Sequence, residues 1–213
     1  MKEILNYLSQ TYWKLSDEAM NYVLQKCDEI PVKKGDILME EGQVCGFVWF
    51  IKKGMLRACQ HYLDDTKKTV KVYSNWFMKE LDIATSVLSF FLQLPSEEAV
   101  VADEDGVVFR MSRTDLFDGI ARFPSICGLT LLIVIKYYCE ARFNETYLRM
   151  KAPHLIHQRL LAEFPELLQR SGEKEMATFL GVTGPTFRKI KSGKYRRKKE
   201  EEKKATKTAG KKI

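Results

Sequence analysis

The sequence lacks any apolar run long enough to cross a membrane. The longest nearly apolar stretch, residues 129–135, is followed directly by Lys136. The N-terminal segment MKEILNYLSQ carries Glu3 early and lacks the apolar core and cleavage site of a secretory signal. We therefore expect a cytoplasmic protein that makes no membrane contact.

Clustered metal ligands are also missing. Histidine occurs three times, and cysteine five times, at 27, 45, 59, 127 and 139, without a Cys-x-x-Cys pair. Scattered cysteines in apolar contexts are typical of buried free thiols in a reducing compartment. His154 and His157 could share a helix face as metal ligands, but the lack of further ligands at suitable spacing favours ordinary surface histidines. We expect no metal site and no other cofactor.

Residue combinations that carry catalysis are likewise missing. The sequence shows no Ser/His or Cys/His arrangement and no spaced pair of carboxylates. The adjacent Glu97 and Glu98 would point to opposite faces of a strand, so they do not form an acid/base pair. We expect a protein that is not an enzyme.

What the sequence does contain is a strong local excess of positive charge. The net charge of the chain is +7, and residues 188–213 alone carry 13 Lys and Arg against 3 Glu. The rest of the chain is therefore slightly acidic. A basic segment of this kind is the electrostatic footprint expected of a protein that binds phosphate. A basic tail alone could equally be a solvated end.

The basic region begins inside the segment KEMATFLGVTGPTFRKIK, residues 174–191, whose pattern predicts two short helices. A short helix face is predicted at Met176, Ala177, Phe179 and Leu180. Gly181 is expected to end that helix, and Thr183 can cap a second one with Pro185 in its first turn. The second helix would turn Phe187 and Ile190 inward and basic residues outward. This pattern predicts a helix-turn-helix, with an ordinary helical hairpin as the alternative.

Residues 28–112 change to the pattern of short strands. Strands are predicted at residues 47–51, 55–62, 69–73, 98–102 and 107–111. Turn signals such as Lys53-Gly54 separate them, which favours an antiparallel barrel or jelly roll. The alternation of strands and helices that marks a Rossmann-type domain is missing.

Helical patterns flank this β-rich region. Ser16 is a suitable N-cap for a helix over residues 17–25. Ser112 and Asp115 approximate a capping box for a helix over residues 113–121.

A long helix is predicted from Pro124 to about Met150. It is apolar on nearly every side, so two partners must cover it: the β-domain and the same helix of a second copy. A central core helix of a monomer is the alternative. The expected dimer seam is Ile126, Leu129, Ile133, Tyr137, Ala141 and Leu148.

The predicted organisation has four parts. They are residues 1–123, a β-roll sensor domain with flanking helices; residues 124–150, the dimerisation helix; residues 151–193, the helix-turn-helix domain; and residues 194–213, a basic tail. The tail is low in complexity and has no apolar face, so we expect it to be disordered.

This order of elements resembles the CRP/FNR family of bacterial transcription regulators, to which the cyclic-AMP receptor protein belongs. In KKGDILMEEGQ…FIKKGMLR, Gly35, Gly42 and Gly54 match the family's turn glycines. The segment RLLAEFPELLQR…EKEMATFLGVT resembles Bacteroidetes-type members. The resemblance covers residues 15–192 and implies an α+β fold. That fold has an N-terminal double-stranded β-helix (jelly-roll) domain of cyclic-nucleotide-binding type, a dimerisation helix and a C-terminal helix-turn-helix domain.

The same resemblance implies partners. Members act as homodimers on double-stranded DNA, with RNA polymerase as a further partner and a small-molecule effector, whose identity here the sequence does not give.

The ligand-binding cassette departs from the family pattern. In place of F-G-E-L the chain has Phe77-Met78-Lys79-Glu80-Leu81, which keeps the ribose-binding Glu and loses the Gly. In place of R-S/T-A it has Ser96-Glu97-Glu98-Ala99-Val100, with Glu97 where the phosphate-binding Arg would stand. An attraction on the order of 4 kcal/mol thereby becomes a repulsion.

The cassette is therefore expected to be degenerate and not to be controlled by cyclic AMP. Its residues are Glu80, Leu81, Glu97, Glu98 and Ala99. The β-roll would bind another ligand or serve only as a scaffold for dimerisation and interaction.

The second helix of the helix-turn-helix departs as well. Where family members often read T-P-E-T-L-S-R-I, this chain reads TGPTFRKI, so a base preference is not carried over. The expected DNA-contacting residues are Thr183, Gly184, Pro185, Thr186, Arg188, Lys189, Lys191, Lys194, Arg196 and Arg197. The alternative function is a ligand-binding or protein-interaction module with vestigial DNA binding.

Overall fold

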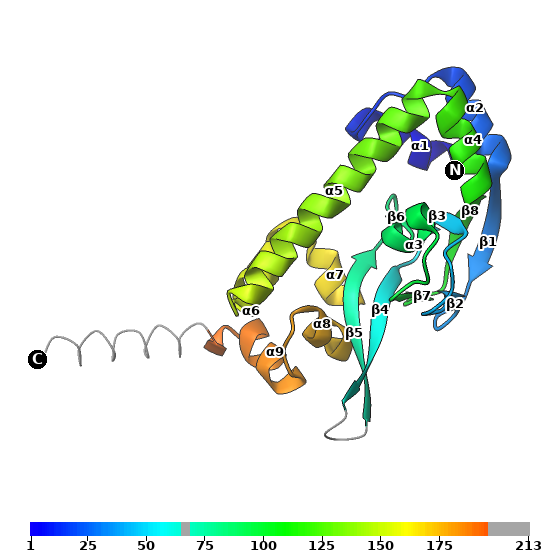
Figure 1. Ribbon diagram of the computed structural model, residues 1–213. Coiled ribbons are helices and arrows are strands. Elements are labelled where there is room, and N and C mark those ends of the chain that lie inside the picture. Colours follow the sequence, from blue (N-terminus) through cyan, green and yellow to red (C-terminus); the bar gives the residue numbers. More distant parts are fainter. Residues whose placement is uncertain (65–68, 196–213) are drawn as a thin grey trace, which may run out of the picture. The chain divides into compact units, whose positions relative to one another are not determined.

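The computed structural model describes residues 1–64 and 69–195 (Figure 1). The chain divides into two compact units, Met1–Glu140 and Ala141–Ile213. The boundary falls inside the long helix α5, Pro124–Arg149, which corresponds to the predicted helix over residues 124–150. Arg196, Arg197 and most of the predicted basic tail lie outside the described residues.

The first unit is a jelly roll of two four-stranded antiparallel sheets (Figure 1). The strand order is β1-β8-β3-β6 in one sheet and β2-β7-β4-β5 in the other. The strands are β1 Cys27–Val32, β2 Ile37–Met39, β3 Phe47–Lys53, β4 Leu56–Asp64, β5 Thr69–Met78, β6 Ile83–Ala84, β7 Ala99–Ala102 and β8 Gly106–Ser112. The predicted jelly roll is confirmed.

The five predicted strands correspond to β3, β4, β5, β7 and β8, and three strands were missed. β2 and β6 contain only three and two residues, too few for an alternating pattern. β1 contains Pro31, which argues against a strand in sequence reasoning.

In the part of the first unit that the structure describes, four helices precede α5. They are α1 Lys2–Thr11, α2 Asp17–Lys26, α3 Val87–Leu92 and α4 Arg113–Arg122. The Ser16 hydroxyl accepts a hydrogen bond from the Ala19 N–H at 3.2 Å, and the Ser112 hydroxyl accepts one from the Asp115 N–H at 3.0 Å. Both predicted N-caps are therefore confirmed.

Two turns of the roll meet at a pair of glycines. Gly54, between β3 and β4, has a φ of 96°, a conformation that favours glycine. A Cβ on Gly54 would lie 3.0 Å from the Gly106 Cα, and a Cβ on Gly106 would lie 2.1 Å from the Lys53 carbonyl oxygen. Neither glycine can therefore carry a side chain in this packing.

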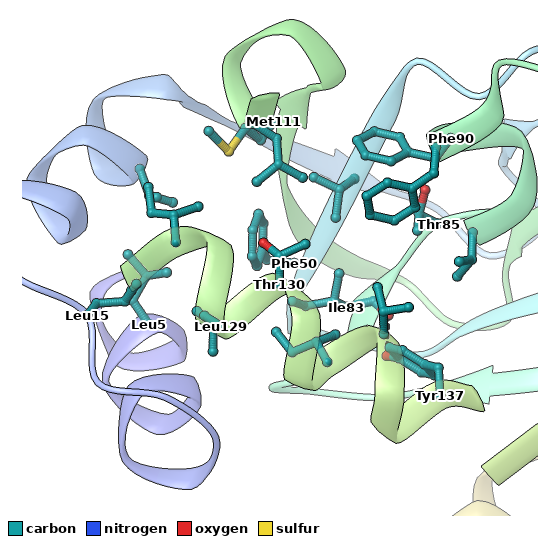
Figure 2. Close-up of a pocket in the computed structure, with 18 residues that line it drawn as sticks. Leu5, Leu15, Phe50, Ile83, Thr85, Phe90, Met111, Leu129, Thr130 and Tyr137 are labelled. Atoms are coloured by element: carbon teal, nitrogen blue, oxygen red, sulfur yellow. Dashed lines mark hydrogen bonds between the residues drawn. The ribbon is translucent and has the colours of Figure 1, made fainter. Parts of the chain in front are cut away.

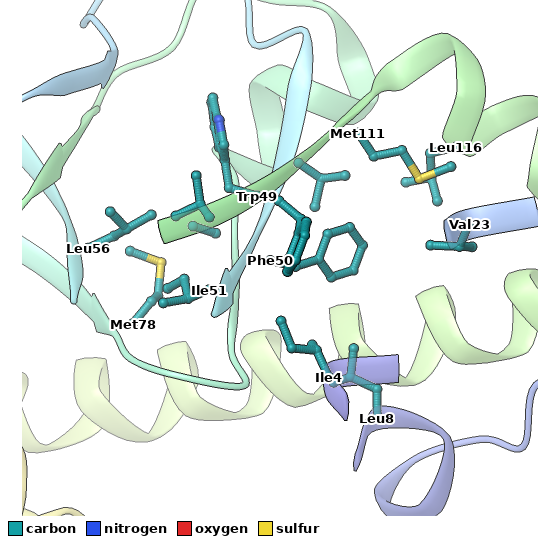
Figure 3. Packing of buried hydrophobic residues seen from close by; sticks show 14 of the residues in the cluster. Ile4, Leu8, Val23, Trp49, Phe50, Ile51, Leu56, Met78, Met111 and Leu116 are labelled. Atoms are coloured by element: carbon teal, nitrogen blue, oxygen red, sulfur yellow. The ribbon is translucent and has the colours of Figure 1, made fainter. Parts of the chain in front are cut away.

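The core of the first unit lies on both sides of β3 (Figure 3). Successive side chains of a strand point to opposite faces. Trp49 and Ile51 pack with Leu56 and Met78 of the other sheet, while Phe50 points towards the helices. The space between the two sheets is thus filled by apolar side chains.

Helix α5 packs on the roll through the residues that were predicted to form the dimer seam. Ile126 and Leu129 belong to the core of the first unit, and Ile133 packs against it. The Tyr137 hydroxyl donates a hydrogen bond to the Ile83 carbonyl oxygen of β6. These four predicted seam residues therefore pack against the chain's own first unit, and their role in a dimer stays a prediction.

Helix α5 leaves other apolar side chains of the first unit uncovered. Leu131, Ile135 and Tyr138 are 57%, 45% and 64% exposed. Of the other predicted seam residues, Ala141 is half-buried and Leu148 is exposed.

The second unit is helical after the end of α5. Its helices are α6 Pro153–Glu163, α7 Pro165–Arg170, α8 Glu173–Phe179 and α9 Gly184–Lys191. Their shared core contains Ile156, His157, Leu160, Leu167, Met176, Ala177, Leu180, Phe187 and Ile190.

Two expectations about single residue types need correction. Cys45 and Cys59 are buried as predicted, whereas Cys27 is only half-buried and Cys127 and Cys139 on α5 are exposed. His157 is 5% exposed and therefore is not a surface histidine. Within residues 1–64 and 69–195, no group of three or more metal-binding side chains occurs, and no helix has the length and apolar character of a membrane span.

Candidate nucleic-acid interface and ligand cassette

A tight turn joins α8 to α9, as the sequence predicted. Gly181 has a φ of 64°. Its N–H donates to the Thr178 carbonyl at 3.0 Å, and the Val182 N–H donates to the Ala177 carbonyl at 2.9 Å. These two bonds form a Schellman motif, which ends a helix at a left-handed glycine. The turn therefore follows from local sequence alone.

Helix α9 is amphipathic in the predicted sense. Phe187 and Ile190 are 3% and 6% exposed and pack into the second unit. The basic residues Arg188, Lys189 and Lys191 are exposed. Because i and i+3 positions share a helix face, the apolar pair fixes which side of α9 remains outside.

The start of α9 differs in one detail from the prediction. Thr183 occupies the N-cap position, but its side chain makes no capping hydrogen bond. Its hydroxyl instead lies 3.0 Å from the Thr186 hydroxyl, while Pro185 is in the first turn as expected. Thr183 and Pro185 are exposed, and Gly184 and Thr186 are half-buried.

Arg188 is paired with an acidic residue. Its Nη1 lies 2.6 Å from Oε1 of Glu173, at the start of α8, and the two side chains are 62% and 46% exposed. An exposed pair of this kind contributes at most about 1 kcal/mol to stability. It does set the direction of the Arg188 side chain, which sequence reasoning missed because the partners lie 15 residues apart.

His157 of α6 packs against Phe187 on the buried side of α9. Its ring lies at 77° to the Phe187 ring, with centroids 6.0 Å apart. Burial, and secondarily the charge of Lys191, lowers the pKa of His157. The histidine is therefore held neutral as part of the packing under α9.

In the first unit, the retained acid of the ligand cassette has a structural partner. The Glu80 carboxylate accepts a hydrogen bond from the Gly54 N–H at 2.8 Å. The next residue, Leu81, has a φ of 71°, and its N–H donates to the Ile51 carbonyl at 3.0 Å. Glu80 and Leu81 thus tie the turn after β5 to the turn after β3.

The second part of the cassette forms a closed turn. The Ser96 hydroxyl accepts a hydrogen bond from the Glu98 N–H at 3.1 Å and lies 2.9 Å from the Ser86 hydroxyl. Glu97 is exposed, and Ala99, at the start of β7, is 3% exposed. Burial raises the pKa of Glu98, which accepts a hydrogen bond from the Asn75 side chain at 3.1 Å. The predicted cassette residues therefore present carboxylates rather than cations.

Arg57, on the adjoining strand β4, is positively charged but already forms an ion pair with Asp103. Its Nε donates to both carboxylate oxygens of Asp103 at 3.0 Å, and the two side chains are only 11% and 14% exposed. Separating this pair to bind a phosphate would leave a buried carboxylate without its partner, which is costly.

Comparison with known families places the first unit. Residues 29–123 match the cyclic nucleotide-binding domain family. No curated protein sequence matches the chain significantly.

Solved structures share the fold over most of the chain. FixK2 from Bradyrhizobium japonicum has a TM-score of 0.66 at 15% identity, covering 80% of this chain and 85% of that one. The c-di-GMP responsive global regulator CLP from Xanthomonas campestris has a TM-score of 0.63 at 11% identity, with 82% and 89% covered. The catabolite activator protein of Thermus thermophilus has a TM-score of 0.53 at 15% identity, with 87% and 85% covered.

The chain therefore combines a jelly roll of the cyclic nucleotide-binding type with a following helical region. It shares this fold with FixK2 and with the catabolite activator protein.

Proposed function

We propose that this protein is a homodimeric, DNA-binding transcription regulator of the CRP/FNR type, with the C-terminal segment of the Bacteroidetes-type members. The observation that carries the proposal is α9, which is anchored by Phe187 and Ile190 and exposes basic residues on its outer face. An exposed helix with such a face fits the major groove, where basic side chains meet both base edges and phosphates. In this function α8 and α9 are a helix-turn-helix and α9 is its recognition helix.

The contacts to DNA fall into two groups. Arg188 and Lys189, with Thr183 and Thr186, would face the groove, next to the helix start at Gly184 and Pro185. Lys191 and Lys194 would contact the phosphate backbone. Both are exposed, and both follow the groove-facing residues in the sequence. Arg196 and Arg197 extend the same basic run in the sequence.

Dimerisation is proposed through the exposed apolar face of α5 in the first unit. Leu131, Ile135 and Tyr138 follow one another at steps of four and three residues, so they form one stripe. In a two-fold symmetric dimer the interface would bury each of these residues on both subunits. A symmetric dimer would bind two half-sites about one helical turn apart. RNA polymerase is a further partner proposed from the CRP/FNR likeness.

We further propose that cyclic AMP is not the effector and that the protein has no catalytic role. A cyclic phosphate would meet Glu97 and Glu98 in the cassette, while Arg57 is held by Asp103. The space between the sheets is filled by Trp49 and its neighbours.

DNA binding is tested by gel shift on fragments of the neighbouring promoter region at increasing salt. We expect the logarithm of affinity to fall steeply with the logarithm of salt concentration, by about 0.9 for each phosphate contact. The double variant Arg188→Ala/Lys189→Ala should lose specific binding. Lys174→Ala, which removes an exposed lysine of α8, should not. An affinity that hardly responds to salt would refute the proposal.

A further inference from the structure

The first unit contains a cavity outside the cassette. Its volume is about 70 Å³, and it lies between α5, the sheet that contains β3 and β8, and helices α1 to α4 (Figure 2). Phe50 of β3 and Met111 of β8 border it from the sheet, and Leu129 and Tyr137 border it from α5. Figure 3 shows that Phe50 lies on the opposite side of β3 from Ile51 and Met78, so this cavity is not the space between the two sheets.

The lining of the cavity is almost entirely apolar. None of its eighteen residues is charged, and the hydroxyl groups come from Thr85, Thr130 and Tyr137 alone. Two of these hydroxyls are already used, because Thr85 donates to the Phe47 carbonyl at 3.0 Å and Tyr137 donates to the Ile83 carbonyl. Burying a charge without a partner in such a site is very costly, so a charged ligand is excluded.

The size of the cavity limits the ligand further. A dry apolar cavity of about 150 Å³ is known to bind benzene or xenon. The cavity here has roughly half that volume, and it is likewise lined by Leu, Ile, Val and Phe. A nucleotide is therefore too large as well as charged. What fits is an uncharged molecule of a few carbon atoms.

We propose that this cavity is a binding site for a small, uncharged, mostly apolar molecule such as a short aliphatic compound. The body of the ligand contacts Phe50, Leu129 and Ile133. A single polar group on it reaches the hydroxyl of Thr130 on α5, since the hydroxyls of Thr85 and Tyr137 are already used. The same helix carries the cavity wall on one face and the exposed stripe of Leu131 and Tyr138 on another.

Xenon is a suitable probe because it is apolar and small. The experiment records methyl proton–carbon NMR spectra of the full chain under increasing xenon pressure. We expect saturable shifts at the methyl groups of Leu129, Ile133 and Val134 and none at the exposed Leu88 and Leu92. Uniform small shifts across all methyl groups, or no shifts, would overturn the proposal.

Two variants locate the site, with a matched control. Val134→Phe places a larger side chain at the cavity wall and should weaken xenon binding at least tenfold. Val44→Phe makes the same change at a residue that is 48% exposed and should leave binding unchanged. Thr130→Val keeps the shape and should bind xenon as well as the wild type, which shows that the folded cavity is being measured. Undiminished xenon binding by Val134→Phe would contradict the proposal. The measurement involves no DNA, so it can fail or succeed independently of the proposed regulator function.

Discussion

At the residue scale, His157 links the stability of the second unit to pH. Its folded-state pKa is lowered by burial and then by Lys191, so it lies below the value of about 6.5 in an unfolded chain. Below about pH 6.5 the unfolded chain takes up the proton more readily than the folded chain. The contribution of His157 to stability is therefore present above that pH and is lost as the pH falls towards the folded-state pKa.

We predict that the free energy of unfolding of the second unit decreases between pH 7 and pH 5. His157→Gln, which cannot be protonated in this range, should show a shallower decrease. Urea unfolding, followed through hydrogen exchange of the α6 and α9 amides, measures both slopes. Identical slopes for the two proteins would mean that His157 does not carry the pH dependence.

In the proposed function, Glu173 would reduce the positive charge that α9 offers to DNA, because it pairs with Arg188. Its carboxylate is bound to Arg188, which would have to exchange this partner for DNA. We predict that Glu173→Gln raises DNA affinity severalfold and steepens its dependence on salt by up to about one phosphate contact. Fluorescence anisotropy with a labelled operator measures both.

The matched control for Glu173 is Glu175→Gln in the first turn of the same helix. This variant removes one negative charge of α8 but leaves the ion pair of Glu173 with Arg188 in place. Its effect on DNA affinity should therefore be smaller. Equal effects of the two variants would show that only the net charge of α8 matters.

At the scale of elements, the proposed dimer depends on the exposed apolar face of α5. Burying a leucine side chain contributes about 1.5–3 kcal/mol, and a two-fold interface buries Leu131 twice. We predict that Leu131→Glu weakens dimerisation by at least 100-fold, as measured by analytical ultracentrifugation, while the jelly roll stays folded. Leu88→Glu, at a leucine of α3 with 55% exposure, is the control and should leave the dimer intact. A variant that remains dimeric would exclude this face of α5.

The same helix shows how far sequence reasoning reached. Its start at Pro124 and its end near Arg149 were predictable, because proline marks a first turn and Pro153 follows the end. Which face packs inward was not predictable. The stretch from Leu129 to Ile135 is apolar on nearly every side, so periodicity does not separate a core face from an interface.

Local chemistry explains the successful predictions. Ser16, Ser112 and Gly181 act through hydrogen bonds or dihedral angles within a few residues, so the sequence contains the whole signal. The pairs of Arg57 with Asp103 and of Glu80 with Gly54 join residues 46 and 26 positions apart. Only the folded chain reveals such contacts.

At the scale of the whole molecule, the proposed loss of cyclic-nucleotide recognition rests on several structural features at once. Glu97 replaces the positive charge that a cyclic phosphate needs with a negative one. Glu80 accepts a hydrogen bond from the turn at Gly54, and Trp49 and Met78 help to fill the space between the two sheets. We predict that Glu97→Arg alone does not create micromolar binding of cyclic AMP in isothermal titration calorimetry. Micromolar binding by this variant would show that charge alone had closed the site, and micromolar binding by the wild type would contradict its proposed loss.

The contact between Gly54 and Gly106 has a consequence for how this protein can change over generations. A side chain at either position collides with the backbone of the other turn, so neither glycine can be replaced without a shift of the facing turn. The residues at positions 54 and 106 are therefore constrained together, although they lie 52 positions apart in the sequence. Substitutions should therefore be tolerated better at exposed positions such as Leu88 and Leu92 of α3 than at either glycine, and an insertion should avoid both turns.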